Sequence, residues 1–316
     1  MKKFILAIVG LLLLVILGSA LFFYLRPLSV LAYVSRRSLA KAGFTEKTVD
    51  TVVGPQVSLQ KGSGPTLVFL HGAGDNAGAW AKVAPPFAKQ YRLVLADLPG
   101  HGASAPRGGP LKMRTVIDGT EEVLSRLPPP LLLVGNSLGG WLAMLYAQHH
   151  PERVQRLVLV DGGATRGNRP DLARIPAGRE DTRKMWQSVV DAGTPTPPDF
   201  VLDDIARSLR HGPVGRLVAA GDMESYVMRE AELPSVVVPV DLVWGESDRL
   251  VNLEYARQLE SGLPAARLTT LAHCGHVPQN ECPRAFAAAL EKILAQAPPK
   301  PRPSAPVKQA AIKEKK

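Results

Sequence analysis

Short apolar runs, rich in valine and leucine, recur along the middle of the chain. Runs that are apolar at every position are typical of strands covered on both faces. Such runs lie at 65–72, 91–100, 130–137, 154–163, 238–246 and, more weakly, 266–276. Segments with apolar residues at helical spacing lie between them, at 79–89, 112–127, 138–149, 252–261 and 284–295.

This alternation of strands and helices predicts an α/β fold with a mostly parallel sheet and helices on both faces. Residues 164–234 break the pattern, because they contain helical pieces such as "EDTRKMWQSVVDAG" and no strong strand. We expect an inserted helical cap there. Active sites of open α/β sheets lie at the carboxyl ends of the strands, so this cap would hang over the site.

The N-terminal segment is apolar and uncharged over residues 4–25, which is long enough to cross a bilayer as a helix. A possible cleavage site, "GSA" at 18–20, is followed by the apolar "LFFYL", which favours an uncleaved membrane anchor. A cleaved signal peptide, which would give a secreted protein, and a buried core helix are the alternatives.

Basic residues flank this segment on both sides, with Lys2 and Lys3 before it and Arg26, Arg36, Arg37 and Lys41 after it. Because a short signal-like leader usually leaves its amino end in the cytoplasm, we expect the body on the outer face, which is the periplasm if the source is a bacterium.

The composition, 46% hydrophobic and 21% charged, is that of a globular protein. Half of the net charge of +10 lies in 299–316, which holds six Lys or Arg and one Glu. This proline- and lysine-rich stretch cannot bury enough apolar surface to fold, so 297–316 is predicted to be a disordered tail that aids solubility. A weak attraction to anionic lipid or nucleic acid is the alternative, and the tail alone does not indicate a nucleic-acid partner.

The expected organisation is therefore an anchor or signal segment at 1–26 and a connecting segment at 27–48, with a polar, helix-like stretch at 35–43. The α/β core follows at 49–163 and 235–296, with the cap at 164–234 and the tail at 297–316.

The pattern G-x-S-x-G occurs at Gly135-Asn136-Ser137-Leu138-Gly139, between an apolar run and a helical segment. This spacing suits a serine on a sharp strand-to-helix turn, because side chains two residues before or after it would collide. The hydroxyl would stand clear of the sheet at the amino end of a helix, where developing negative charge is favoured. Ser137 is the candidate nucleophile, and an incidental serine in a tight turn is the alternative.

A serine hydroxyl needs a base to take its proton. His276, in "HCGHVPQNECP", follows the last predicted strand and is the candidate, with His273 as the rival. His71, in "LHGAG", is expected to hold loop structure instead.

The base in turn needs a carboxylate to fix its tautomer. Asp248, in "LVWGESDRLV", follows a strand and precedes His276, which gives the order Ser, Asp, His. Glu246 is a nearby substitute, and Asp161, after "RLVLV", is a second possible acid.

Two backbone N–H groups are expected to bind the oxyanion of such a reaction. One belongs to Leu138, and the other to Ala73 or Gly74 in the loop after "LVFLHG".

Cys274 and Cys282 lie eight positions apart, which is neither a disulfide framework nor a zinc spacing. We expect them to be unpaired, with a single bridge as the less favoured alternative. The chain shows no phosphate loop, dinucleotide fingerprint or zinc motif, so no cofactor, metal or nucleic-acid partner is expected.

In order and spacing, "HGAGDNAGAW", "DLPGHGAS", "GNSLGG", "WGESD" and "GHVPQNECP" resemble the α/β-hydrolase family over residues 50–296. The resemblance implies an eight-stranded, mostly parallel sheet and a Ser137–Asp248–His276 triad. With the apolar leader, the chain looks like bacterial esterases similar to membrane-anchored monoacylglycerol lipases. Serine at the nucleophile position argues against dehalogenases and epoxide hydrolases, and Asn252 stands near where many members have proline.

The resulting expectation is a serine hydrolase that cleaves a small-molecule carboxylic ester, with lipid-like or acylglycerol esters favoured by the anchor. The motifs are also similar to those of hydrolases that cleave carbon–carbon bonds in ring-fission products. A third hypothesis is a catalytically inactive, membrane-anchored binding protein. The oligomeric state is not indicated.

Overall fold

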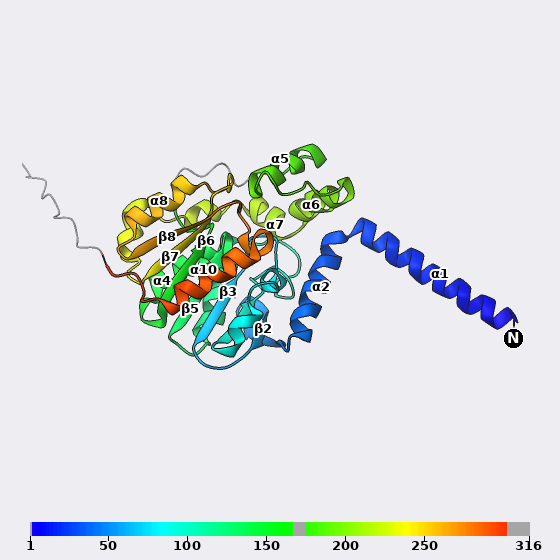
Figure 1. Ribbon diagram of the computed structural model, residues 1–316, viewed down its shortest axis with the longest axis horizontal. Coiled ribbons are helices and arrows are strands. Elements are labelled where there is room, and N and C mark those ends of the chain that lie inside the picture. Colours follow the sequence, from blue (N-terminus) through cyan, green and yellow to red (C-terminus); the bar gives the residue numbers. More distant parts are fainter. Residues whose placement is uncertain (1, 167–174, 302–316) are drawn as a thin grey trace, which may run out of the picture.

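A twisted sheet forms the centre of the molecule in the computed structural model, which describes residues 2–166 and 175–301 (Figure 1). Its order is β1-β2-β4-β3-β5-β6-β7-β8. Strand β2 pairs antiparallel with both β1 and β4, and the six strands from β4 to β8 in this order, β3 included, are parallel to one another. The eight-stranded, mostly parallel sheet implied by the sequence is confirmed. The strands are β1 (Thr45–Thr51), β2 (Gly54–Lys61), β3 (Thr66–Leu70), β4 (Arg92–Ala96), β5 (Leu131–Asn136), β6 (Val154–Val160), β7 (Val240–Gly245) and β8 (Ala266–Leu271).

The hairpin of β1 and β2 is absent from the apolar runs of the sequence. Strand β1 is mostly exposed and reads "TEKTVDT", so it carries no apolar signal. Gly54, with φ of +97°, allows the tight turn between the two strands. Strand β1 therefore gains its stability from pairing with β2, whose central residues are buried.

Helices cover both faces of the sheet, as the alternation predicts. One apolar core lies under α3 (Met113–Ser125), α4 (Leu138–His149) and α8 (Leu253–Gly262). The other lies under α10 (Pro283–Ala295) and includes Trp80 and Phe69. The short α9 (Pro278–Glu281) lies between β8 and α10.

The prediction of a helix at 79–89 is wrong. The chain there forms two short 3₁₀ turns, η1 (Ala77–Trp80) and η2 (Pro85–Lys89). Pro85 and Pro86 lack the N–H groups that a continuous helix needs and break it at that point.

The structure describes the predicted insertion at 164–166 and 175–234, and within these residues three helices lie between β6 and β7. They are α5 (Arg179–Val189), α6 (Asp199–His211) and α7 (Pro213–Ala220), followed by η4 (Met223–Tyr226) and η5 (Glu230–Ser235). The two ends of this insertion meet where the Met228 N–H donates to the Ala164 carbonyl at 2.8 Å. They also meet in an isolated bridge between Thr165 and Met228.

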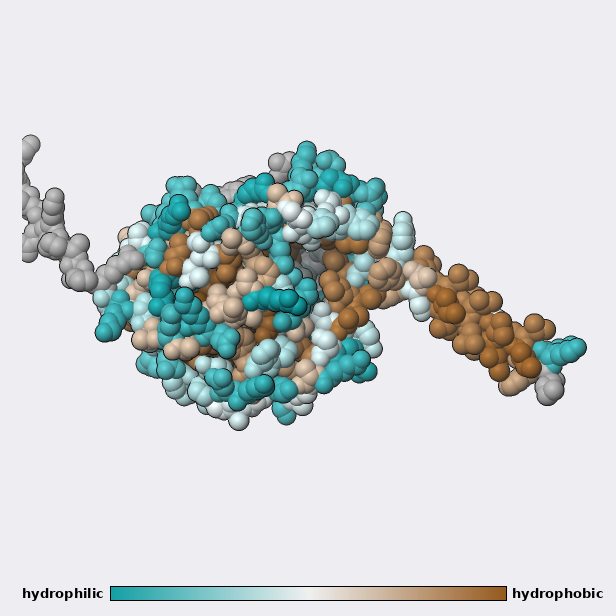
Figure 2. Space-filling view, in the orientation of Figure 1, coloured by the Kyte–Doolittle hydropathy of each residue, from teal (hydrophilic) through white to brown (hydrophobic). Residues whose placement is uncertain are grey.

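Helix α1 (Lys2–Leu25) projects away from the body, and its surface is apolar along most of its length (Figures 1 and 2). Among the described residues it is the one helix whose length and hydropathy suit a membrane span, and none of that span is buried. Its last turn contacts the insertion, where the ring of Tyr24 stacks on Phe200 with centroids 5.1 Å apart.

Helix α2 (Pro27–Lys41) is longer than the polar stretch predicted at 35–43, because Pro27 begins the helix at its first position. The Leu28 N–H donates to the buried Asp204 carboxylate of α6 at 3.0 Å. Most of the predicted tail, 302–316, lies outside the described residues.

Candidate active site

Ser137 lies on the turn between β5 and α4, with φ of +52° and ψ of −115°. This backbone conformation is strained for a residue with a side chain and persists only where the surroundings enforce it. Its N–H donates to the Val160 carbonyl and its carbonyl accepts from the Trp141 N–H, both at 3.0 Å. The turn thus fixes the hydroxyl at the carboxyl edge of the sheet.

Close backbone contacts explain the glycines around this turn. A Cβ at Gly135 would lie closer than 3.0 Å to the backbone of Gly139, and one at Gly139 would collide with Leu70 at the end of β3. Gly162, after β6, leaves room for the backbone of Ser137, whose Cα would lie 2.6 Å from a Cβ there. A side chain at either glycine of the motif would therefore clash with the backbone, at Gly135 with the turn itself and at Gly139 with the neighbouring strand β3.

The structure brings together the three residues that the sequence singles out. His276 Nε2 lies 2.9 Å from Ser137 Oγ, and His276 Nδ1 lies 2.7 Å from Asp248 Oδ2. Both Asp248 and His276 are buried, at 3% and 5% exposure. In this arrangement Nδ1–H donates to the carboxylate, which leaves Nε2 free to accept the serine proton.

Backbone groups hold the ends of this chain of hydrogen bonds. Asp248 Oδ1 accepts the N–H groups of Leu250 at 2.8 Å and Val251 at 2.9 Å, so the other oxygen faces the imidazole. The His276 N–H donates to the Val189 carbonyl of α5 at 2.7 Å.

The rival residues do not join this arrangement. His273 is exposed, has φ of +53°, and is not a hydrogen-bond partner of Ser137. Glu246 is also exposed, and its carboxylate accepts from Thr270 Oγ1 at 2.7 Å.

Asp161 is fully buried at the end of β6, and its Oδ1 accepts the Gly245 N–H at 2.8 Å. Burial raises its pKa well above the ordinary value, and the charge of Asp248 adds to the effect. A raised pKa favours the protonated, neutral form of this carboxyl. Among the described residues, its Oδ2 has no hydrogen-bond partner.

Asn136 is a functional candidate that the sequence reasoning missed. Its Nδ2 donates to the carbonyls of Val160 and His276, and its Oδ1 accepts from Gln279 Nε2, all at 3.0 Å. These bonds tie the end of β5 to the loop that carries His276. The available signal was an amide placed at the end of an otherwise apolar buried strand.

The prediction that the two cysteines are unpaired is wrong. Cys274 and Cys282 form a disulfide, with their Cα atoms 5.9 Å apart. The loop after β8 and the short α9 fold back, so that the start of α10 meets the His276 loop. Eight positions of spacing in the sequence gave no sign of this reversal.

Two residues that border the site have main-chain N–H groups that could serve a ligand. The N–H groups of Leu138, the first residue of α4, and Ala73, after β3, donate to no acceptor within residues 2–166 and 175–301. A first-turn helical N–H has no partner within its own helix, which leaves it available to a ligand. Both residues line the cavity that contains Ser137.

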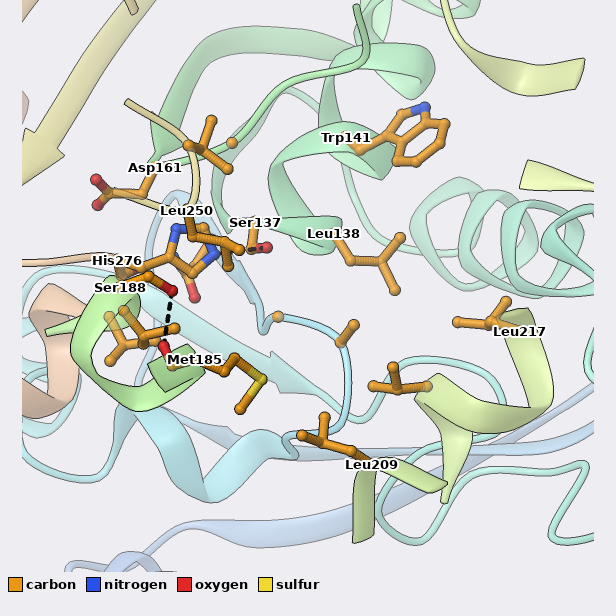
Figure 3. Close-up of a pocket in the computed structure, with 18 of the residues that line it drawn as sticks. Ser137, Leu138, Trp141, Asp161, Met185, Ser188, Leu209, Leu217, Leu250 and His276 are labelled. Atoms are coloured by element: carbon orange, nitrogen blue, oxygen red, sulfur yellow. Dashed lines mark hydrogen bonds between the residues drawn. The ribbon is translucent and has the colours of Figure 1, made fainter. Parts of the chain in front are cut away.

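This cavity measures about 900 Å³ and lies between the sheet edge and the inserted helices (Figure 3). Leu138 and Trp141 from α4, Met185 from α5, and Leu209 and Leu217 from α6 and α7 supply apolar walls. Charged residues of both signs also line it, namely Arg166, Asp181, Lys184 and Glu224. Among the described residues, no cluster of three or more His, Cys, Asp or Glu side chains could hold a metal ion.

A serine on a strained strand-to-helix turn, at the carboxyl edge of this sheet, is the arrangement of the α/β-hydrolase fold. Residues 67–289 match the Alpha/beta hydrolase family, and the chain belongs to that family.

Three similar proteins illustrate the range of relatives. A pimeloyl-[acyl-carrier protein] methyl ester esterase from Nitrosomonas europaea is 32% identical over 251 residues, covering 73% of this chain and 96% of its own. A 2-hydroxy-6-oxononadienedioate/2-hydroxy-6-oxononatrienedioate hydrolase from Cupriavidus pinatubonensis is 31% identical, covering 70% and 83%. The crystal structure of a membrane phospholipase A, a bacterial virulence factor, superposes with a TM-score of 0.74 and 29% identity, covering 93% and 98%. The chain is therefore a hydrolase, and its relatives support esterase activity.

Proposed function

We propose that this protein is a membrane-anchored serine esterase that hydrolyses a lipid-like carboxylic ester through an acyl-enzyme. The observation that carries the proposal is the hydrogen-bonded series Ser137–His276–Asp248 at the floor of a largely apolar cavity. Residues 164–234 act as a cap over this site, and 49–163 with 235–296 form the catalytic core.

In the first half of the reaction, Ser137 Oγ attacks the ester carbonyl while His276 Nε2 takes its proton. Asp248 keeps the imidazole in the required tautomer and stabilises the imidazolium. His276 then gives the proton to the departing alcohol. In the second half, His276 takes a proton from a water that attacks the acyl carbonyl, and gives it to Ser137 Oγ as the acyl–oxygen bond breaks and the acid is released.

The N–H groups of Leu138 and Ala73 bind the oxyanion that forms in both halves. Preorganised donors of this kind favour the transition state over the ground state, and removing one typically lowers turnover by ~10²–10³. The amino end of α4 adds a favourable field for the same charge.

The cavity supports an apolar acyl chain as the substrate group. Trp141, Met185, Leu209 and Leu217 offer an apolar lining, and burial of each methylene contributes about 0.8 kcal/mol. The charged residues Arg166, Lys184, Asp181 and Glu224 suit a polar alcohol or headgroup. The similarity to a membrane phospholipase A favours a membrane lipid as the source of such an ester.

The apolar, unburied helix α1 supports membrane anchoring. With its amino end in the cytoplasm, the body would lie on the outer face of the membrane. Tyr24 and Phe200 would then place the cap close to the lipid surface.

The test is a panel of p-nitrophenyl esters from acetate to palmitate, assayed with the full-length protein in detergent. We expect turnover that rises with chain length beyond acetate and falls by at least 10³ in Ser137→Ala. The matched control is Ser188→Ala, which removes a cavity-lining hydroxyl that bonds the Met185 carbonyl at 2.7 Å. Equal turnover by Ser137→Ala and the wild type would refute the proposal.

A second candidate is hydrolysis of a carbon–carbon bond in a ring-fission dienone, favoured by the relative from Cupriavidus pinatubonensis. The same panel decides between them when a ring-fission dienone is added. Dienone turnover with no ester turnover would favour the second candidate.

A further inference from the structure

Asp97 is a buried carboxylate outside the reacting groups, at the end of β4. Its side chain is fully buried, and it accepts three hydrogen bonds. The donors are the Ala77 N–H to Oδ1 at 2.7 Å, the Ala103 N–H to Oδ2 at 2.8 Å, and Arg36 Nη1 to Oδ2 at 2.7 Å. Arg36 belongs to α2, the helix that follows the apolar segment.

The loop at 72–79, called the oxyanion loop here because it contains Ala73, is held at both ends. At its start, His71 Nδ1 donates to the Gly72 carbonyl at 2.7 Å and Nε2 accepts the Leu98 N–H at 3.0 Å. At its far end, Asp97 binds the Ala77 N–H. The position of the Ala73 N–H therefore depends on where the Asp97 carboxylate lies.

Helix α2 packs directly against this loop. A Cβ at Gly78 would lie 3.0 Å from the Ser35 Cβ and 3.7 Å from the Arg36 backbone nitrogen. Arg36 is also the cation that neutralises Asp97, since an unpaired buried charge is strongly unfavourable. Its second amino group donates to Glu46 on the exposed β1 at 2.8 Å.

We propose that Arg36 is a positioning residue for the esterase reaction: it fixes the Asp97 carboxylate, which in turn fixes the oxyanion loop. This inference rests on the proposed function. The helix leading out of the membrane segment is then part of the catalytic apparatus and not a passive connector. Arg36 does not line the cavity, so its replacement should change kcat, which reports the chemical step, and not KM.

The test compares full-length Arg36→Gln, Arg36→Lys and Arg37→Gln in detergent. Arg37 is the adjacent, exposed arginine of the same helix and serves as the matched control. The concentration of competent sites is measured by fluorophosphonate titration, and kcat is expressed per titrated site. This correction separates a loss of folded protein from a loss of rate.

We expect Arg36→Gln to lower kcat per site about tenfold, because a displaced oxyanion donor costs less than the ~10²–10³ of a removed one. KM should stay within twofold of the wild-type value, Arg36→Lys should recover most of the loss, and Arg37→Gln should match the wild type. In an Asp97→Asn background, where the charge is absent, Arg36→Gln should lower kcat by less than twofold further.

Wild-type kcat per site in Arg36→Gln, even with a lower thermal midpoint, would overturn the proposal and leave Arg36 with a structural role alone. An equal loss in Arg37→Gln would also overturn it, since the effect would then be one of helix charge. Failure of the wild type both to react with fluorophosphonate and to hydrolyse esters would instead refute the proposed function, and this role with it.

Discussion

Replacing Asp161 by asparagine tests whether the Asp161 carboxyl, which lies near Asp248, is neutral in the folded protein. The substitution keeps the shape of the side chain, so Oδ1 can still accept the Gly245 N–H. The new amide is uncharged and carries no titrating proton. Burial, followed by the charge of Asp248, raises the pKa of Asp161 well above 3.8, and Glu281 adds a smaller effect in the same direction.

The sign of the pH effect follows from this shift. The unfolded chain loses the Asp161 proton near pH 3.8, whereas the folded chain keeps it to a much higher pH. The wild-type protein therefore loses stability as pH rises between those two pKa values, at about 1.4 kcal/mol per pH unit for this one group. Asp161→Asn has no such proton, so its stability relative to the wild type should rise by that amount per pH unit within the window.

The assay is urea unfolding of both full-length proteins in detergent at pH 4, 5 and 6, with the difference in free energy taken at each pH. Asp203→Asn is the matched control and should show little pH dependence between pH 5 and 6, because a hydrogen bond from Arg179 lowers the pKa of that exposed carboxyl below 3.8 and leaves it ionised in both states. Turnover by Asp161→Asn at neutral pH should stay within a few-fold of the wild type.

Parallel pH dependences for wild type and Asp161→Asn would show that Asp161 is ionised in the folded protein over this pH range, against the expectation of a raised pKa. A loss of turnover as large as that of Asp248→Asn would make Asp161 the working acid.

Three other changes give separate tests. Reducing the Cys274–Cys282 disulfide, or replacing both residues by serine, should lower the free energy of unfolding by ~2–3 kcal/mol, since the closed loop is short. The measurement is the urea midpoint with and without reductant, and an unchanged midpoint would contradict this expectation. Leu217→Trp should fill part of the apolar cavity and lower kcat/KM for a long-chain ester at least tenfold relative to acetate, whereas an unchanged ratio would mean that the acyl chain lies elsewhere. Asn136→Ala removes three buried hydrogen bonds, each of which contributes about 1 kcal/mol. We expect the free energy of unfolding to fall by ~2–4 kcal/mol in thermal or urea unfolding, together with a lower kcat. Wild-type stability would show that other interactions replace these bonds.

The sequence predicts the parallel part of the sheet well, because each of its buried strands is apolar at nearly every position. It also singles out Ser137, Asp248 and His276, since all three lie where a strand ends and the G-x-S-x-G motif fixes the kind of turn. The chain order then indicates which acid and which histidine to choose. Geometry adds the distances, which no sequence pattern contains.

Other features depend on contacts between distant segments. Strand β1 is exposed and polar and gains its place in the sheet by pairing with β2. Arg36 and Asp97 lie 61 positions apart, and no sequence motif indicates that they pair. The disulfide requires a chain reversal that the spacing of its cysteines does not show.

The most direct test of the central claim is to treat the full-length protein with a fluorophosphonate and locate the adduct by peptide mass spectrometry. We expect one adduct, on Ser137, with ester turnover lost in proportion to labelling and no labelling in Ser137→Ala. An adduct on a different residue that accounts for the loss of turnover, or full turnover with Ser137 modified, would contradict it.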